Sequence, residues 1–347
     1  MNQYAEELRN TAKAMVAPNQ GVLAMDESNR TCNKRFQKVG IDATEEKRRQ
    51  YRQLLLTTPN LGNYISGAIL YDETIRQKTD DGKPFTDVMK DQGVIIGIKV
   101  DTGAKDLAGH PGEKVTEGLD GLRDRIAEYY QMGARFAKWR AVITIGDGIP
   151  TPACLEANAH ALARYAALCQ EGGLVPIVEP EVLIDGDHTI DRCHEVTNQT
   201  LHTVFNQLYT QGIHFDKMIL KPSMVIAGKQ CPQQSSPQEV AERTIECLRN
   251  NVPASVPGIA FLSGGQTVEQ AAEHLNLMNS DSLISQCPWR VTFSYARAIQ
   301  GPGMEHWAGD ANNVKKAQEL IHHRAQCNSA ASMGKYSADM EKQPAMA

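Results

Sequence analysis

The sequence predicts an α/β fold in which eight parallel strands alternate with helices and close into a (β/α)8 TIM barrel. Three observations predict this fold. Eight short apolar runs are spread along the 347 residues, and amphipathic stretches with helix-capping residues separate several of them. The first run is not followed by the G-x-G-x-x-G turn of a doubly wound open sheet, the competing fold. Eight is the number of strands that closes such a barrel, and the length leaves room for an N-terminal helix and a tail.

The predicted strands are short runs rich in Val, Ile, Leu and Phe. They do not alternate with polar residues, which is typical of strands buried on both faces. In chain order they are residues 21–26, 65–71, 94–100, 134–139, 174–180, 217–221, 258–263 and 291–295.

The helical stretches between these runs have recognisable ends. Residues 151–171 repeat small and apolar residues at helical spacing and stop at a Gly-Gly pair. Ser236 with Glu239, and Thr267 with Gln270, have the spacing of capping boxes and therefore predict two helix starts. Further helices are expected over residues 189–211 and 312–326.

The chain has no visible internal boundary before its last residues. No Pro/Gly/Ser-rich linker interrupts the alternation of strands and helices, so residues 1–328 are expected to form a single domain. The composition then changes, and residues 329–347 are expected to form a flexible C-terminal tail.

Charge and composition exclude several classes of function. A net charge of −5 argues against nucleic-acid and membrane-surface partners. No apolar run approaches the roughly 18 residues of a transmembrane helix, and the N-terminal residues do not have the pattern of a secretory signal. The eight cysteines form no C-x-x-C pair, and the ten histidines form no H-E-x-x-H motif. We therefore expect reduced thiols, a cytoplasmic location, no metal and no cofactor.

Three lysines close or interrupt apolar runs: Lys99, Lys138 and Lys221. Lysines are rarely fully buried, and burial favours the neutral amine, which attacks carbonyl carbons. The sequence therefore suggests imine chemistry. Lys221 has the most apolar neighbours and is the predicted nucleophile, with Lys138 as a nearby second cation. The structural alternative is a lysine that extends past its strand end into solvent.

Other polar residues also fall near the carboxyl ends of predicted strands, where a barrel of this type has its active site. Asp26 is the last residue of the first run, Glu179 lies near the end of the fifth, and Glu181 follows that run. A glutamate beside Lys138 is suited to moving protons during imine formation, so Glu179 is the predicted acid/base. Glu181 is either structural or a substrate contact.

Two further groups predict anion sites. Ser263, Gly264 and Gly265 separate a strand from a helix start, where backbone N–H groups bind phosphate. Arg297, with Ser294, strengthens this prediction, because such barrels often bind phosphate after strands seven and eight. A second anion is expected at Lys99 and Arg140.

The strand-end segments LAMDES, GIKVD, FAKWR, IVEPE, LKPSM, FLSGGQ and FSYARA resemble, in order, the motifs of class I fructose-1,6-bisphosphate aldolases, in wording close to the plastid and bacterial branch. The resemblance implies a (β/α)8 barrel that cleaves fructose 1,6-bisphosphate, without a metal, to dihydroxyacetone phosphate and glyceraldehyde 3-phosphate. It also implies a homotetramer, and it adds the plastid stroma as an alternative location for a mature form without its transit peptide.

The resemblance also implies roles for single residues. Lys221 is the implied Schiff-base residue, Glu179 the acid/base, Lys138 its partner and a substrate contact, and Asp26 the group that helps to deprotonate the C4 hydroxyl. The implied substrate contacts are Ser263, Gly264, Gly265, Ser294 and Arg297 at the C1 phosphate, Ser28, Lys99 and Arg140 at the other phosphate, and Arg35 and Arg48 elsewhere.

Three positions depart from the family pattern. Asn29-Arg30-Thr31 stand where animal forms have TGS, and Thr31 is expected to supply the serine's hydroxyl. Ala296 stands where many members have glycine. The chain ends in QPAMA rather than tyrosine, and its last tyrosine is Tyr336, so proton transfer by a terminal tyrosine is not expected.

The predicted function is therefore that of a class I aldolase in glycolysis, gluconeogenesis or carbon fixation. The alternatives are another imine-forming TIM-barrel aldolase, for instance one acting on a monophosphate, a non-catalytic scaffold on the same barrel, and a metal-dependent aldolase. The preference between six-carbon and seven-carbon bisphosphates, such as sedoheptulose 1,7-bisphosphate, stays open.

Overall fold

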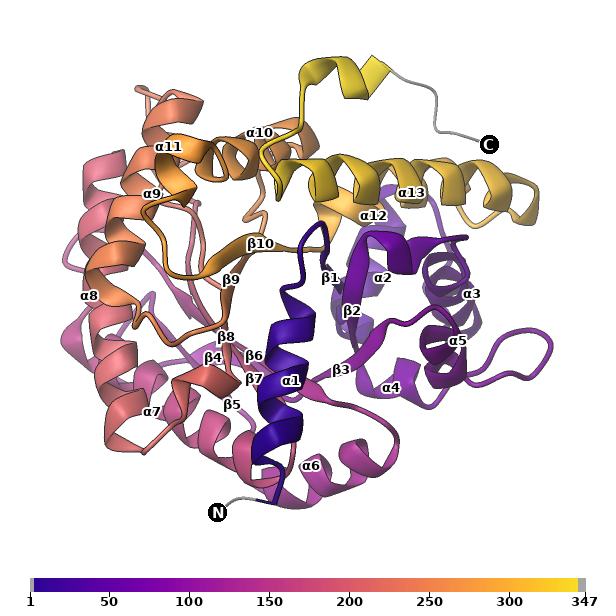
Figure 1. The fold of residues 1–347 in the computed structure, drawn as a ribbon, viewed down its shortest axis with the longest axis horizontal. Coiled ribbons are helices and arrows are strands. Elements are labelled where there is room, and N and C mark those ends of the chain that lie inside the picture. The colour runs from indigo at the N-terminus through magenta and orange to yellow at the C-terminus, as the bar shows by residue number, and fades with distance from the viewer. Residues whose placement is uncertain (1–2, 343–347) are drawn as a thin grey trace.

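The structure, a computed structural model, describes residues 3–342 and contains a closed barrel of eight parallel strands (Figure 1). Around the barrel the strands follow the order β1-β10-β9-β8-β7-β6-β3-β2. Their bounds are β1 Gly21–Ala24, β2 Ile65–Leu70, β3 Ile95–Lys99, β6 Phe136–Ile143, β7 Val175–Val182, β8 Ile219–Leu220, β9 Gly258–Phe261 and β10 Arg290–Tyr295. All eight predicted strands, and the predicted fold class, are confirmed.

Helices surround this barrel (Figure 1). They are α1 Ala5–Met15, α2 Asn29–Lys38, α3 Glu45–Leu56, α4 Asp72–Ile75, α5 Phe85–Asp91, α6 Leu122–Gln131, α7 Pro152–Glu171, α8 Ile190–Thr210, α9 Pro237–Asn251, α10 Val268–Met278, α11 Asp281–Ile284, α12 Arg297–Trp307 and α13 Val314–Ala331. Short 3-10 turns occupy Leu61–Asn63, Phe215–Lys217, Ala311–Asn313 and Ala338–Lys342. Among the helices of residues 3–342, none is both long and apolar enough to cross a bilayer.

The predicted helix starts before α9 and α10 are present. The hydroxyl of Ser236 accepts a hydrogen bond from the backbone N–H of Glu239. At α10 the full reciprocal pair forms between Thr267 and Gln270. These caps fix where the chain turns from a strand end into a helix, and so they set the shape of the loops beside the barrel mouth.

Strands β6 and β7 are longer than predicted. They pair with each other from Phe136–Val175 to Ile143–Val182, in a register that places Arg140 opposite Glu179. Because β7 continues through Pro180, Glu179 and Glu181 have the two-residue spacing of one strand face. A two-stranded antiparallel sheet, β4 Gly103–Asp106 with β5 Lys114–Glu117, was not predicted because it has no apolar run.

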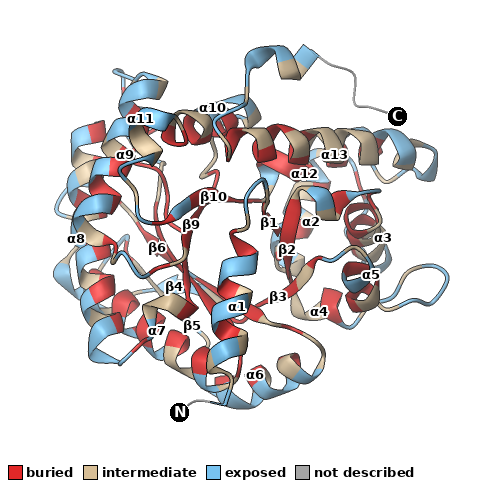
Figure 2. Ribbon diagram, in the orientation of Figure 1, coloured by how far each residue is buried: buried red, intermediate tan, exposed pale blue. Residues whose placement is uncertain are grey.

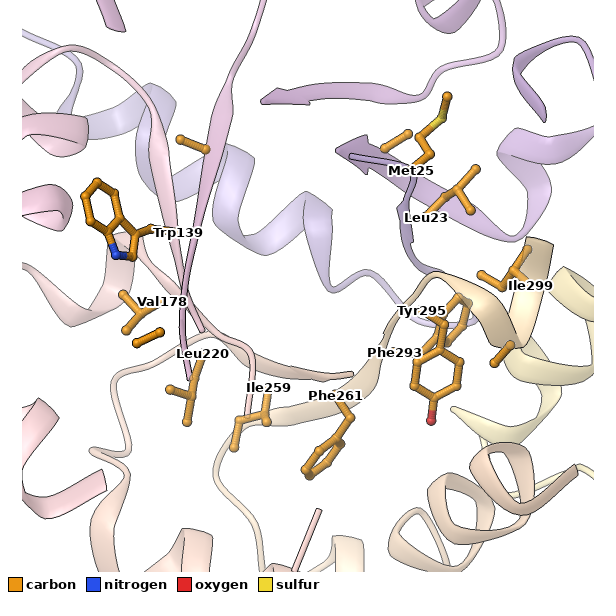
Figure 3. Packing of buried hydrophobic residues seen from close by; sticks show 14 of the residues in the cluster. Leu23, Met25, Trp139, Val178, Leu220, Ile259, Phe261, Phe293, Tyr295 and Ile299 are labelled. Atoms are coloured by element: carbon orange, nitrogen blue, oxygen red, sulfur yellow. The ribbon is translucent and has the colours of Figure 1, made fainter. Parts of the chain in front are cut away.

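The core forms two layers. Figure 2 shows buried residues along the barrel strands and on parts of the surrounding helices. The larger layer lies between the strands and the surrounding helices, and Figure 3 shows Leu220, Ile259 and Phe261 on neighbouring strands of it. The smaller layer lies inside the barrel, where Phe136 is fully buried. A Cβ on Gly97 would lie 2.2 Å from the Phe136 ring, so only glycine fits at that position. Residues of α1 belong to the same layer, and α1 crosses one end of the barrel (Figure 1).

The end of the chain is described as far as residue 342. Helix α13 continues to Ala331, past the predicted end of the domain. The Tyr336 hydroxyl donates a hydrogen bond to Glu341 at 2.8 Å, and Arg324 of α13 donates to both oxygens of that carboxylate. The division at residue 328 and the flexibility of residues 329–347 stay predictions. The QPAMA ending, residues 343–347, lies outside the described residues.

Candidate active site

A cavity of about 520 Å³ opens at the carboxyl end of the strands. All four predicted catalytic residues line it: Asp26, Lys138, Glu179 and Lys221. The predicted substrate contacts that line it are Ser28, Thr31, Arg35, Lys99, Arg140, Glu181, Ser263, Gly264, Ser294 and Arg297. Residues that are far apart in the sequence therefore meet in one cavity, as expected when parallel strands end at the same face of a barrel.

Lys138 lies at the centre of a cluster of buried charges. Its Nζ is 2.9 Å from Asp26 Oδ2, 3.5 Å from Glu179 Oε2 and 3.6 Å from Asp101 Oδ2. Only 4% of the Lys138 side chain is exposed. A buried cation with three carboxylates around it keeps those groups in fixed positions, because each of them would be costly to leave unpaired.

The charges of this cluster shift the pKa values of its members. Burial acts to raise the pKa of Asp26, but the positive charges of Lys138 and Lys221 outweigh it, so the pKa lies below its usual range. Burial acts to lower the pKa of Lys138, and Asp26 and Glu179 reverse that effect, so it lies above its usual range. Asp26 is therefore ionised and Lys138 charged at neutral pH.

Lys221 follows β8 and is buried, with 4% of the residue exposed. Its backbone N–H donates to the carbonyl of Val178 at 2.8 Å, which continues the strand pairing to the lysine itself. Its Nζ is 3.2 Å from Glu179 Oε1. Glu179 thus faces Lys221 through one oxygen and lies at ion-pair distance from Lys138 through the other, a position from which it can accept a proton from Lys221.

Asp101 is a functional candidate that the sequence analysis did not single out. It is buried, its Oδ1 lies 2.7 Å from Lys99 Nζ, and its Oδ2 accepts from the backbone N–H of Arg140 at 3.3 Å. It comes two residues after the end of β3, just as Asp26 comes two residues after the end of β1, so the rule that indicated Asp26 also applies to it. On the same side of the cavity, Arg140 Nε forms an ion pair with Glu181.

A cation and a buried hydroxyl face the cavity from β10 and α12. The Ser294 Oγ is buried and, within the described residues, has no hydrogen-bond partner. Arg297 begins α12 and, in the same range, makes no ion pair with a carboxylate. Gly264, at φ +54°, turns the chain from β9 toward α10. These groups can hold an anion, since they offer a charge, a hydroxyl and the start of a capped helix.

Ser28, Thr31 and Arg35 lie on α2 and at its start. The Ser28 hydroxyl accepts from the backbone N–H of Thr31, and the two hydroxyl oxygens are 3.2 Å apart. Arg35 pairs with Glu27, a second lining residue that the sequence analysis missed. Arg35 also donates to Gln300 at 3.1 Å.

Two predicted substrate contacts are not among the lining residues. Arg48 is directed to Glu73, with Nη2 2.7 Å from Oε2, and donates to Asn33 at 3.0 Å. Gly265 lies next to the cavity, beside Arg297. Ala296, which departs from the family pattern, does line the cavity.

The described residues contain one cluster with ligand atoms suited to a metal, and it is outside this cavity. His323, Cys327 and Glu341 bring one such atom each within 4.8 Å of the others. Both oxygens of Glu341 already accept from Arg324, at 2.6 and 2.5 Å, so that carboxylate is neutralised by an arginine.

A parallel barrel with buried amines and carboxylates at its carboxyl end defines a TIM-barrel enzyme equipped for imine or proton-transfer chemistry. Its family follows from comparison with known proteins. Residues 7–347 match the family described as fructose-bisphosphate aldolase class-I. The chain therefore belongs to the class I fructose-bisphosphate aldolases, which are lyases, and the predicted family and enzyme class are confirmed.

Individual relatives named as fructose-bisphosphate aldolases are similar to this chain over nearly its whole length. A probable fructose-bisphosphate aldolase class 1 of Xanthomonas campestris is 60% identical over 332 residues, which cover 95% of this chain and 98% of that protein. The chloroplastic fructose-bisphosphate aldolase 2 of Pisum sativum is 50% identical over 342 residues, covering 99% and 97%. A solved structure of the Plasmodium falciparum aldolase superposes with a TM-score of 0.95 at 45% identity and covers 97% of each chain.

Proposed function

We propose that this aldolase forms its imine on Lys221 and that Glu179 moves the protons this requires. Glu179 Oε1 takes a proton from Lys221 Nζ, 3.2 Å away, and the neutral amine attacks the C2 carbonyl carbon of fructose 1,6-bisphosphate. The attack leaves the nitrogen positively charged, and one of its protons passes to the C2 oxygen to give a carbinolamine. Glu179 then protonates that C2 hydroxyl, which leaves as water, and a protonated imine remains. That contact, inside a cavity with cations on both sides, is the observation that carries the proposal.

Cleavage follows from the electron demand of the imine. Asp26 removes the proton of the C4 hydroxyl, and the C3–C4 bond breaks as the C4 oxygen becomes the aldehyde of glyceraldehyde 3-phosphate. The electron pair of that bond moves toward the imine nitrogen and gives an enamine. A proton is then added at C3, which balances the proton that Asp26 took up and must release. Addition of water to the resulting imine releases dihydroxyacetone phosphate and restores Lys221. Lys138 positions Asp26 and Glu179 for these steps, since it lies 2.9 and 3.5 Å from them.

The two phosphates are proposed to bind on opposite sides of the barrel mouth. Around the barrel, β9 and β10 lie across from β3 and β6. The C1 phosphate is assigned to the first side and the other phosphate to the second. The first group comprises Ser263, Gly264, Ser294 and Arg297, with Gly265 as a neighbour. The second comprises Lys99 and Arg140, and it is completed by Ser28 and Thr31 from the segment after β1, which lies between β10 and β2. Two anchored ends align the open-chain sugar over Lys221.

The proposal is tested with Lys221→Met, which has nearly the same shape and no amine. We expect fructose 1,6-bisphosphate cleavage to fall by at least about a thousandfold, while equilibrium dialysis still detects substrate binding. Lys99→Met is the matched variant, and it should weaken binding and retain turnover at saturating substrate. Substantial cleavage by Lys221→Met would contradict the assignment, and loss of activity on addition of EDTA would favour a metal-dependent mechanism.

Three further proposals concern assembly, location and substrate range; the first and third follow from the family resemblance, and the location from the pattern of the N-terminal residues and the cysteines. The subunits are proposed to assemble as a homotetramer, which light scattering would detect as four times the 38.2 kDa chain. The cytoplasm is the proposed location. Sedoheptulose 1,7-bisphosphate is proposed as a second substrate, and the ratio of kcat/KM for the two sugars would measure the preference.

A further inference from the structure

Lys229, in the loop between β8 and α9, lies beside the cavity although it is not one of the predicted site residues. The position of its amine is seen from the space around Gly265, where a side chain would meet it. A Cβ on Gly265 would lie 2.6 Å from Lys229 Nζ and 3.3 Å from Arg297 Nη2. The ammonium of Lys229 and the guanidinium of Arg297 therefore meet over the same glycine, next to Gly264 and Ser263.

The backbone of Lys229 is held in place by the neighbouring loop after β7. Its N–H donates to the carbonyl of Ile184 at 2.9 Å. The N–H groups on either side do the same: Gly228 donates to His188 at 2.8 Å and Gln230 to Gly186 at 2.9 Å. Three successive hydrogen bonds fix this segment, so the base of the lysine side chain has a set position beside the barrel mouth.

The two cations have little negative charge near them. Within the described residues, the one carboxylate within ion-pair distance of Lys229 is Asp185, at 3.8 Å and 71% exposed. Such a long, solvated pair contributes little. Arg297 has no carboxylate partner in the same range. Two neighbouring cations without a shared carboxylate repel each other, and an anion bound between them would relieve that repulsion.

The charge of the substrate matches this arrangement. A phosphate monoester carries about −1.5 to −2 charges near neutral pH. Arg297 supplies one positive charge to the proposed C1-phosphate site, and the remaining groups there, Ser263, Gly264 and Ser294, are neutral. A second cation is needed to balance the dianion, and the amine over Gly265 is the cation in position to do so.

We propose that Lys229 is a further substrate-binding residue, which closes over the phosphate held by Arg297 and the loop from Ser263 to Gly265. This inference rests on the proposed function, because it assumes that the C1 phosphate binds there. Lys229 contacts neither the imine carbon nor the bond that breaks. Its effect is therefore on substrate affinity and on the ionic strength dependence of that affinity.

The test is Lys229→Met, measured in the direction of synthesis, where the two phosphates enter on separate molecules. The side chain is 40% exposed, so we expect a moderate effect. The KM for dihydroxyacetone phosphate should rise about three- to tenfold, with kcat and the KM for glyceraldehyde 3-phosphate within about twofold of the parent. Inhibition by inorganic phosphate should weaken in parallel, and Lys229→Arg should restore most of the affinity.

Two controls separate this proposal from the proposed function. Lys105→Met removes an exposed charge beside Ala104, on another side of the mouth, and should leave both KM values unchanged. Arg297→Met removes the other cation of the phosphate site. If Arg297→Met raises the KM for dihydroxyacetone phosphate and Lys229→Met does not, the role of Lys229 is refuted and the phosphate site stands. If neither variant changes it, the assignment of the C1-phosphate site itself is refuted.

Discussion

Replacing Lys138 with methionine would remove an ammonium that contacts three buried carboxylates. Its distances to Asp26, Glu179 and Asp101 are 2.9, 3.5 and 3.6 Å. Methionine is similar in length and apolar, so the substitution leaves a filled site without a charge. The carboxylates would then be buried together without the cation that they share.

The size of the effect follows from the burial of the group. Removing one partner of a buried ion pair costs about 3–5 kcal/mol, because the other partner is left uncompensated. No correction for solvent screening is needed, because 4% of the Lys138 side chain is exposed. For a chain of this length that loss corresponds to a fall in melting temperature on the order of 10 °C. Lys90→Met, which breaks an exposed pair with Asp87, is the matched control and should cost less than about 0.5 kcal/mol.

The dependence on pH identifies the cause. In the parent, the pKa of Asp26 is lowered, so its stabilising contribution is present above the usual aspartate range and is lost as the pH falls through the lower folded value. Burial raises the pKa of Asp26, and without Lys138 less positive charge opposes that effect, so the pKa of Asp26 should rise in the variant. The folded variant then takes up a proton before the unfolded chain does. The stability difference between variant and parent should therefore shrink from about pH 8 to about pH 5.

The assay is urea denaturation of both proteins across that pH range, with the free energies of unfolding compared at each pH. A difference that stays constant from the alkaline to the acid end would refute this reasoning, because it would mean that the loss comes from packing rather than from unpaired charge.

Three other variants test separate parts of the account. Ser294→Ala should raise the KM for fructose 1,6-bisphosphate about 10- to 100-fold without lowering the free energy of unfolding, because its buried hydroxyl has no partner among the described residues; a loss of stability would contradict this. Arg48→Gln should lower the free energy of unfolding by about 1–3 kcal/mol, because the pair with Glu73 is lost. The KM should change less than about twofold, and a larger change in steady-state kinetics would mean that the arginine contacts substrate. Burial lowers the pKa of His274 to about 4, below that of the unfolded chain, so protons bind the unfolded state first as the pH falls below the usual histidine value. As the pH falls from about 7 to about 4.5, the free energy of unfolding should decrease by roughly 2 kcal/mol less in His274→Leu than in the parent, which denaturation at each pH would measure. Equal decreases in the two proteins would contradict this prediction.

The barrel was predictable because strands buried on both faces need apolar residues at successive positions, and eight such runs appear in the sequence. The β4–β5 pair was not predictable, because the residues of Gly103–Asp106 are mostly exposed and so carry no apolar pattern. The extra length of β6 and β7 also escaped prediction. It depends on the pairing that places Arg140 beside Glu179, which is a property of the assembled sheet.

The site was predictable as a set of residues more than as a set of contacts. Strand ends and family motifs indicated Lys138, Glu179 and Lys221 together. They did not indicate that Glu179 lies between the two lysines, since that contact depends on the order of β6, β7 and β8 around the barrel. Arg48 was predicted from a motif alone, and the structure gives its charge a different partner, Glu73.

The measurement that most directly tests the imine on Lys221 is reductive trapping. The protein is incubated with dihydroxyacetone phosphate and sodium borohydride, digested, and mapped by mass spectrometry, with Lys221→Met treated in parallel. We expect one reduced adduct, on Lys221, and none on the variant. An adduct on Lys138 or Lys99, or no adduct at all on an active enzyme, would contradict it.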